Sequence, residues 1–251
     1  RLPSGTTVEA MQEQVDQRLA AINRMMSTYD PNSELSEFNR SESMDWFPVS
    51  SETATVVAFA LEVARESSGK FDPTIGPLVN LWGFGPEKRT GKPPPDAAIA
   101  AARNRVGYQH LAVRTKPPAL KKDIGDLYVD LSAIAKGYGV DAIAEMLDDL
   151  GVPGYMIEIG GEVRTRGKKP DGSIWKIGVE NPENASKPIR YVMPLVDESV
   201  ATSGDYRNSF TYAGRQFSHT IDPATGCPVE NKLAIVTVRA PTCMKADAFS
   251  T

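Results

Sequence analysis

The chain has 251 residues, of which 41% are hydrophobic and 24% charged, and its formal net charge is −4 at neutral pH. A chain of this length and composition can bury one large core or two smaller ones, as a globular enzyme does. No segment gathers the lysines and arginines that contacts to nucleic-acid phosphates require, which argues against a nucleic-acid-binding protein. The longest apolar runs fall well short of the roughly 20 residues of a membrane span.

The first half of the chain is predicted to be mainly helical. Apolar residues three or four apart, with polar residues between them, indicate an amphipathic helix over 7–27. A second helix is predicted over 52–67, capped by Ser50 or Ser51 and ended by Gly69. Glycines and prolines break residues 71–85 too often for a long regular element. Further on we expect helices at 96–104 and 133–150 and short strands at 110–114, 119–122 and 127–129.

The second half is predicted to consist mainly of antiparallel strands, with one helix at its end. Alternating patterns indicate strands at 155–159, 162–166, 174–179, 190–195, 199–203, 209–212, 217–221 and 234–239. Residues 244–251 resemble the opening of a helix without a stop signal, so we expect the natural chain to continue past Thr251. The fold class is therefore predicted as α+β. We expect one catalytic unit over 1–251, with two intimately packed subdomains as the alternative.

Two cysteines, Cys227 and Cys243, are too few for a disulfide framework and lack the partners of a zinc site. We interpret both as ordinary thiols. A bridge between them remains open if the compartment is oxidising. The chain begins at Arg1, without an initiator methionine or an apolar signal core, so its localisation is not readable from this end.

Two segments rich in small residues could approach a ligand. Residues 130–141 follow a predicted strand and open a helix, where Lys136 could meet a phosphate; a solvated lysine at an ordinary helix start fits equally well. Gly160 and Gly161 interrupt a strand pattern, which favours a tight hairpin or a bulge over direct ligand contact.

Two further groups of residues are candidates for proton transfer and for binding a cation. His219 is one of only two histidines and stands at a predicted strand end near Asp222 and Thr225, a position suited to proton transfer. The alternative is that it only braces the turn through Asp222. Asp247 and Thr251 stand four residues apart in a predicted helix, so both could face one hard cation.

Seven short motifs occur in a specific order along the chain. They cover residues 25–30 with 36–39, 69–74 with 81–85, 130–141, 158–162, 201–206, 218–226 and 243–247. In this order they resemble the FAD:protein FMN transferase family, known as the ApbE family, over nearly the whole chain. The resemblance implies an ApbE-like α+β fold and a magnesium-dependent transferase.

The resemblance also implies a set of site residues. Magnesium would be held by Asp247, Thr251 and the backbone carbonyl of Ala133. The FAD-contacting residues would be Met25, Tyr29, Lys70, Phe71, Asp72, Asp130, Lys136 and Ile221. Oxygen ligands suit magnesium, aromatic and apolar side chains suit a stacked ring system, and Lys136 suits the pyrophosphate.

By this resemblance, a threonine hydroxyl of an acceptor protein would attack the FMN-side phosphorus of FAD and release AMP, with His219 as the candidate general base. An FAD pyrophosphatase and a non-catalytic FAD-binding protein remain alternatives. The family implies an acceptor with a Ser/Thr flavinylation motif, in a membrane respiratory subunit. It also implies a periplasmic lipoprotein anchored to the inner membrane.

Overall fold

The computed structural model describes residues 5–86, 91–182, 186, 188–204, 208–230 and 233–251, and the chain divides into two compact units. Unit 1 consists of Arg1–Ile22, Ile134–Gly204 and Leu233–Thr251. Unit 2 consists of Asn23–Ala133 and Asp205–Lys232. Both units are discontinuous in sequence, and helix α1 (Val8–Met26) begins in unit 1 and ends in unit 2.

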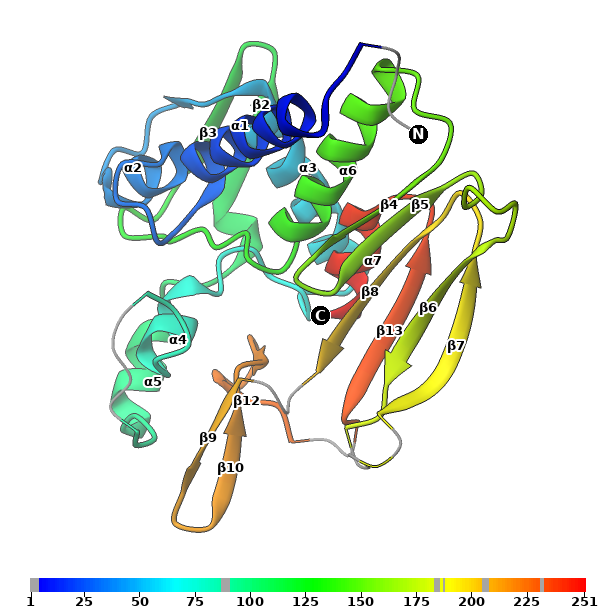
Figure 1. Ribbon diagram of the computed structural model, residues 1–251. Helices are drawn as coiled ribbons and strands as arrows, with labels where there is room; N and C mark the ends of the chain where they lie inside the picture. Colours follow the sequence, from blue (N-terminus) through cyan, green and yellow to red (C-terminus); the bar gives the residue numbers. More distant parts are fainter. Residues whose placement is uncertain (1–4, 87–90, 183–185, 187, 205–207, 231–232) are drawn as a thin grey trace. The chain divides into compact units, whose positions relative to one another are not determined.

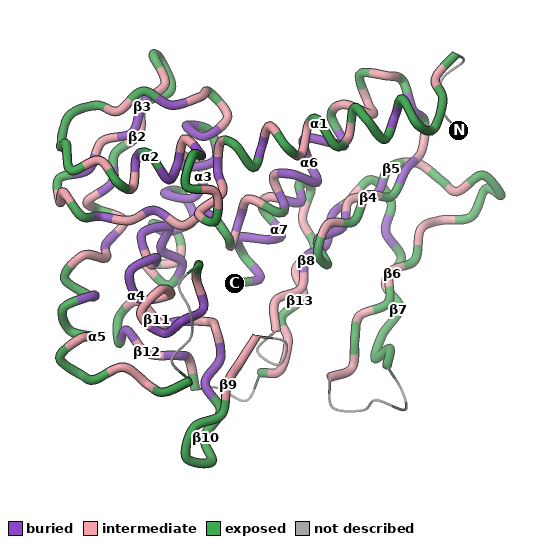
Figure 2. The backbone as a smooth tube through the Cα atoms, turned by 60° about the vertical axis from the view of Figure 1, so that its left-hand side comes forward, coloured by how far each residue is buried: buried purple, intermediate pink, exposed green. Residues whose placement is uncertain are grey.

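Unit 1 is built on an antiparallel four-stranded sheet covered by helices α6 (Ala135–Asp149) and α7 (Cys243–Ser250). Helix α6 packs on β4 and β5, α7 packs on β5, β8 and β13, and the two helices pack on each other (Figure 1). In spatial order the strands are β13 (Ile235–Ala240), β8 (Ser199–Gly204), β5 (Glu162–Arg166) and β4 (Tyr155–Ile159). Both helices contain runs of buried residues (Figure 2).

Unit 1 contains two antiparallel hairpins, one within the four-stranded sheet and one separate from it. Strands β4 and β5 are joined by Gly160 and Gly161, whose φ angles of +64° and +104° lie in the region that glycine adopts at no steric cost. The predicted tight hairpin at this position is therefore confirmed. Strands β6 (Trp175–Glu180) and β7 (Ile189–Leu195) form a separate ribbon.

In its described residues, unit 2 combines a small sheet, four helices besides the end of α1, and two hairpins. The sheet has the order β1 (Phe47–Pro48), β3 (Pro118–Lys122) and β2 (Leu111–Thr115). The helices are α2 (Glu34–Arg40), α3 (Ser51–Glu66), α4 (Gly76–Leu81) and α5 (Asp96–Arg103), with a 3₁₀ turn, η1 (Tyr108–His110). The hairpins are β9 (Ser209–Tyr212) with β10 (Arg215–Ser218), and β11 (Ile221–Asp222) with β12 (Cys227–Pro228).

An aromatic cluster forms part of the core of unit 2. The rings of Trp82 and Phe217 stack at 5.4 Å between centroids, and Phe217 stacks on Phe210 at 5.2 Å. The Trp82 indole N–H donates to the Gly226 carbonyl, so the one polar atom of this ring is satisfied although it is buried. The cluster thus joins α4 to the hairpins that flank His219.

The predicted helices are confirmed with small shifts at their ends. Ser50 caps α3 by accepting a hydrogen bond from the Thr53 N–H. Gly69, with φ +78°, ends that helix and donates its N–H to the Ala64 carbonyl. The short helices α2 and α4 were not predicted, because each spans only two turns or fewer.

Two predicted strands are wrong. Residues 127–129 form no strand, because the Asn39 side chain takes both backbone groups of Val129: its amide donates to the carbonyl at 2.9 Å and its oxygen accepts from the N–H at 2.8 Å. The strand predicted at 217–221 is broken after Ser218, where β10 ends before β11 begins. The His219 N–H still donates to the Asn208 carbonyl at 3.0 Å, but the Thr220 carbonyl accepts from the Val229 N–H at 2.9 Å, so the chain changes its pairing partner at this point.

The structure also bears on the cysteines. Cys227 and Cys243 are both free thiols, the second buried.

Across the residues that the structure describes, no helix is long and apolar enough to cross a membrane.

Candidate functional site

In unit 1, the predicted metal ligand Asp247 lies in α7 and is only 2% exposed. Its Oδ2 atom accepts a hydrogen bond of 2.8 Å from the backbone N–H of Gly137, in the first turn of α6. The close approach of the two helices requires a residue without a side chain at Gly137, because a Cβ there would lie 2.7 Å from the Asp247 Cβ. The start of α6 therefore fixes the orientation of this carboxylate.

Lys136 is the neighbour of Gly137 and is held by Glu162, the first residue of β5. The Lys136 ammonium lies 2.6 Å from Oε1 of Glu162. Glu162 is 2% exposed, and its Oε2 has no hydrogen-bond partner among the described residues. Lys136, predicted to meet the pyrophosphate, is thus held at the amino end of α6, where backbone N–H groups also favour an anion.

The two buried carboxylates of this group disfavour each other's charge. Burial raises the pKa of Asp247 above its ordinary value, against the lowering effect of Lys136 and the Gly137 N–H. Burial also raises the pKa of Glu162, which its hydrogen bond with Lys136 lowers and the charge of Asp247 raises. When both acids are ionised, one ammonium faces two carboxylates. A hard cation fits this arrangement, because it prefers oxygen ligands and its positive charge would offset the excess negative charge near the unpaired Glu162 oxygen.

The other two predicted metal ligands are neutral oxygens. Thr251 ends α7 and its hydroxyl donates to the Asp247 carbonyl at 3.4 Å, as expected for residues four apart on a helix. Ala133 is half-buried and is the last residue of the long segment of unit 2. Within the described ranges, no three His, Cys, Asp or Glu side chains gather as a metal cluster. A cation here would therefore depend on neutral oxygens as well as on Asp247.

In unit 2, the predicted FAD-contacting run of Lys70, Phe71 and Asp72 forms a braced loop. Oδ1 of Asp72 accepts from the N–H and hydroxyl of Thr74, and Oδ2 accepts from the Tyr108 N–H. Burial raises the Asp72 pKa despite these donors. Lys70 is exposed and forms an ion pair of 3.3 Å with Asp222. The Asp72 carboxylate thus holds the loop that presents Lys70, and its contact with FAD stays a prediction.

The remaining predicted FAD residues of unit 2 differ in exposure. Met25 is half-buried in the last turn of α1, and Tyr29 is 65% exposed just beyond it. Asp130 is half-buried and accepts from the N–H and hydroxyl of Ser132, while Ile221 is buried in the core cluster. Tyr29 is available to stack on a ring. In the motif at 201–206, Asp205 and Tyr206 lie outside the described residues.

His219 lies between β10 and β11 and is half-buried, with its ring 6.3 Å from that of Phe84 in an edge-on arrangement. The turn that follows is braced by Asp222, whose carbonyl accepts from the N–H groups of Thr225 and Gly226. Its carboxylate accepts from the Ala224 N–H and from Lys70. These contacts stabilise the turn, and both roles considered for His219, proton transfer and bracing, stay predictions.

The sequence prediction assigned no role to Glu162 or Asp141, although both lie in motifs that it singled out. Glu162 is a buried acid at the start of a strand, and Asp141 is a buried acid inside α6. Ionisable residues are almost never fully buried unless they are paired, so an acid within an apolar stretch of sequence is a signal of such a role. In Asp141 that signal is an acid among the apolar residues Val140, Ala142 and Ile143.

We expect Gly137→Ala to lower both the stability of the protein and its affinity for divalent cations. The new Cβ would lie 2.4 Å from the Cys243 carbonyl oxygen, which is backbone and cannot rotate away. The helices must then separate, at a cost of about 1–3 kcal/mol for overpacking, and the Gly137 N–H moves from Asp247. Thermal unfolding and calorimetric titration with Mg²⁺ would measure the two effects.

Gly139→Ala is the matched control, two residues further along the same helix. Its Cβ would meet only side-chain atoms of Ile159 and Leu19, at 3.7 and 3.9 Å, which are ordinary contacts. Because alanine is the better helix former by about 0.5–1 kcal/mol, this variant should be at least as stable as the parent. Equal behaviour of the two variants would contradict the tight contact at Gly137.

Comparison with known proteins places this arrangement in a family. The family model described as "ApbE family" matches residues 3–251. The FAD:protein FMN transferase of Vibrio cholerae is 45% identical over 243 residues, which is 97% of this chain and 72% of that protein. The Escherichia coli protein of the same name is 38% identical over 243 residues, 96% of this chain and 69% of that protein.

Solved structures agree with the sequence comparison. The flavin transferase ApbE from Vibrio cholerae superposes with a TM-score of 0.91 at 42% identity, covering 100% of this chain and 79% of that one. The apo form of the Pseudomonas stutzeri flavinyl transferase ApbE superposes with a TM-score of 0.90 at 38% identity, covering 100% and 77%. The predicted ApbE-like α+β fold is thereby confirmed. The chain belongs to the ApbE family.

Proposed function

We propose that this protein transfers the FMN moiety of FAD to a threonine hydroxyl of an acceptor protein, releases AMP, and uses magnesium to do so. The observation that carries the proposal is the match of nearly the whole chain to proteins named FAD:protein FMN transferase, at 45% identity for the Vibrio cholerae protein. A chain that shares its fold and motifs with these relatives is best assigned the same reaction class.

The chemistry of the predicted ligands supports the magnesium part of the proposal. Asp247, Thr251 and the carbonyl of Ala133 would supply oxygen ligands, the donor type that Mg²⁺ prefers. When bound, the ion would stabilise negative charge on the phosphoryl oxygens and on the leaving AMP. Lys136, held by Glu162 at 2.6 Å, would bind the pyrophosphate as a point charge with a fixed position.

The residues of unit 2 would bind the flavin nucleotide and handle the proton. Tyr29 and Met25 offer aromatic and apolar surface for a ring system, and the loop of Lys70 and Phe71 is held in place by Asp72. His219 would accept the proton of the threonine hydroxyl as its oxygen forms a bond to the FMN-side phosphorus. The bond from that phosphorus to the AMP phosphate breaks, and AMP leaves with the electron pair.

The acceptor is proposed to be a membrane respiratory subunit with a Ser/Thr flavinylation motif. We propose further that the enzyme works in the periplasm as a lipid-anchored protein. Both points rest on the resemblance to the family.

Binding of nucleotides tests the substrate assignment before any turnover is measured. We expect FAD to bind more tightly than FMN or NAD, because the predicted residues would contact both the flavin half and the pyrophosphate. Isothermal titration with each nucleotide in the presence of Mg²⁺ measures the preference. Equal or tighter binding of NAD would contradict FAD as the substrate.

A further inference from the structure

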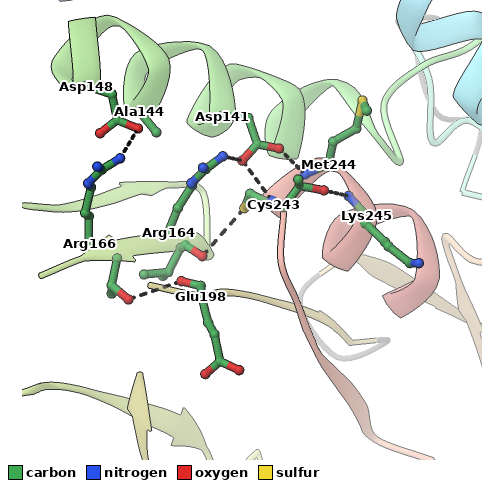
Figure 3. Close-up of polar contacts among 12 residues, drawn as sticks. Asp141, Ala144, Asp148, Arg164, Arg166, Glu198, Cys243, Met244 and Lys245 are labelled. Atoms are coloured by element: carbon green, nitrogen blue, oxygen red, sulfur yellow. Dashed lines mark hydrogen bonds and ion pairs between the residues drawn. The ribbon is translucent and has the colours of Figure 1, made fainter. Parts of the chain in front are cut away.

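The amino end of α7 is bound by a side chain from another helix. The carboxylate of Asp141, in α6, accepts the Cys243 N–H at 2.9 Å through Oδ1 and the Met244 N–H at 2.8 Å through Oδ2 (Figure 3). The third N–H of that turn, from Lys245, is taken by the capping hydroxyl of Thr242. Two of the N–H groups that a helix start leaves without intrahelical partners are thus satisfied by Asp141.

A buried carboxylate needs hydrogen-bond donors to compensate for its lost hydration, and Asp141 has a third donor besides the two backbone N–H groups. The Arg164 guanidinium, from β5, lies 2.5 Å from Oδ1 of Asp141. Both side chains are largely shielded from water, so their attraction is only weakly screened. Arg164 and the two N–H groups therefore leave this carboxylate one orientation in which all its contacts are made.

This contact bears directly on the proposed metal ligand. Gly137 and Asp141 lie one turn apart on one face of α6, and Cys243 and Asp247 lie one turn apart on the facing side of α7. Gly137 donates to the Asp247 carboxylate, while Asp141 holds the backbone of Cys243. The two helices are thus joined at two points, of which only one touches Asp247.

We propose that Asp141 is a positioning residue of the transferase: by fixing the first turn of α7, it holds Asp247 where a divalent cation can be bound. The proposal rests on the proposed function, in which Asp247 is a magnesium ligand. Asp141 itself touches neither the cation nor the substrate in this account. Partners that orient a metal ligand commonly alter metal affinity by about 10–100-fold when they are replaced.

The test is calorimetric titration of Mg²⁺ into the FAD-saturated protein, for the parent and for Asp141→Asn. Asparagine has one acceptor oxygen in place of two, and its amide N–H₂ would face a backbone N–H. We expect the Mg²⁺ affinity to fall by about 10–100-fold, with FAD affinity measured without metal unchanged. Hydrogen exchange of the segment 243–251 should become faster, because the first turn of α7 opens more often.

Asp148→Asn is the matched control. Asp148 lies two turns further along α6, pairs with Arg166 of β5 at 2.6 Å and accepts from the Tyr155 hydroxyl, so it also joins α6 to the sheet (Figure 3). These described contacts of its side chain are with the sheet rather than with α7, and its replacement removes the same charge. We expect Mg²⁺ affinity within about threefold of the parent and unchanged exchange over 243–251.

Arg164→Gln distinguishes an effect of the position of Asp141 from an effect of electric charge on Mg²⁺ binding. It also replaces Asp141→Asn as the test if that variant does not fold. Removing a positive charge near the cation should tighten Mg²⁺ binding if only the electric field matters. If Asp141 acts by position, loss of its partner loosens the contact with α7 and Mg²⁺ binding weakens.

The outcomes separate this proposal from the proposed function. Parent-like Mg²⁺ affinity in Asp141→Asn, or tighter binding in Arg164→Gln, overturns the positioning role while the metal-dependent reaction stands. A parent protein that binds FAD but no Mg²⁺ removes Asp247 as a ligand, and with it both the positioning role and the metal part of the proposed function. Weakened Mg²⁺ binding in both variants, with a parent-like Asp148→Asn, supports positioning.

Discussion

Replacing Asp247 by asparagine should abolish magnesium-dependent FMN transfer while the protein stays folded. Asp247 is the one carboxylate among the three proposed cation ligands, so its loss removes most of their charge complementarity. Charge stabilisation by a metal contributes several kcal/mol to phosphoryl transfer, which corresponds to a rate loss of about 10³-fold or more. Asparagine can still accept the Gly137 N–H, so the contact between α6 and α7 is kept.

The same substitution should not destabilise the fold. Burial raises the pKa of Asp247 above its value in the unfolded chain, so the ionised form at neutral pH costs folding free energy. A neutral side chain of the same shape removes this cost, and the midpoint of thermal unfolding should stay the same or rise.

Thr251→Ala is the companion variant for Asp247→Asn. It removes a neutral oxygen, which contributes less than a carboxylate, and we expect a smaller loss of transfer. Steady-state rates across a range of Mg²⁺ concentrations would distinguish the two variants. Transfer by Asp247→Asn at the parent's magnesium affinity would mean that the cation binds elsewhere.

His219→Ala should lower FMN transfer by about 10²–10⁴-fold, the usual contribution of a positioned general base. FAD and Mg²⁺ affinities should stay close to those of the parent, because the proposed role concerns only the proton of the incoming hydroxyl. Single-turnover rates with saturating FAD measure the effect on the chemical step. A loss confined to FAD affinity or thermal stability would instead assign His219 to bracing the turn.

The second histidine provides the control. His110 pairs with Asp123 at 2.8 Å between Nδ1 and Oδ1, at the end of η1 in unit 2. Its partner is well exposed, so the pair contributes about 0–1 kcal/mol to stability. His110→Ala should therefore transfer FMN at the parental rate. A loss as large as that of His219→Ala would show that the assay does not report a specific base.

Local patterns were enough to predict most elements of the fold. The apolar spacing of residues 7–27 and the cap at Ser50 depend on neighbours within one or two turns, and both agree with the structure. Residues 127–129 show where this reasoning fails. Their composition favours a strand, but the amide of Asn39, 90 residues earlier, takes the backbone groups of Val129. Such a contact leaves no trace in the local sequence.

The candidate site divides in the same way. The spacing of Asp247 and Thr251 is a local property of a helix, and it agreed with the family resemblance. Glu162 and Asp141 take their roles from burial and from distant partners; the bond from Cys243 to Asp141 spans 102 residues. Sequence motifs located these acids, but their functions depend on contacts that only the folded chain provides.

Mass spectrometry of a threonine-containing acceptor peptide tests the central claim most directly. The peptide is incubated with the protein, FAD and Mg²⁺, beside a peptide in which the threonine is replaced by alanine, and AMP is quantified in the same samples. Transfer predicts that only the threonine peptide gains the mass of an FMN group, with one AMP released for each labelled peptide. AMP released at the same rate with both peptides, and no label on either, would contradict transfer and identify an FAD pyrophosphatase.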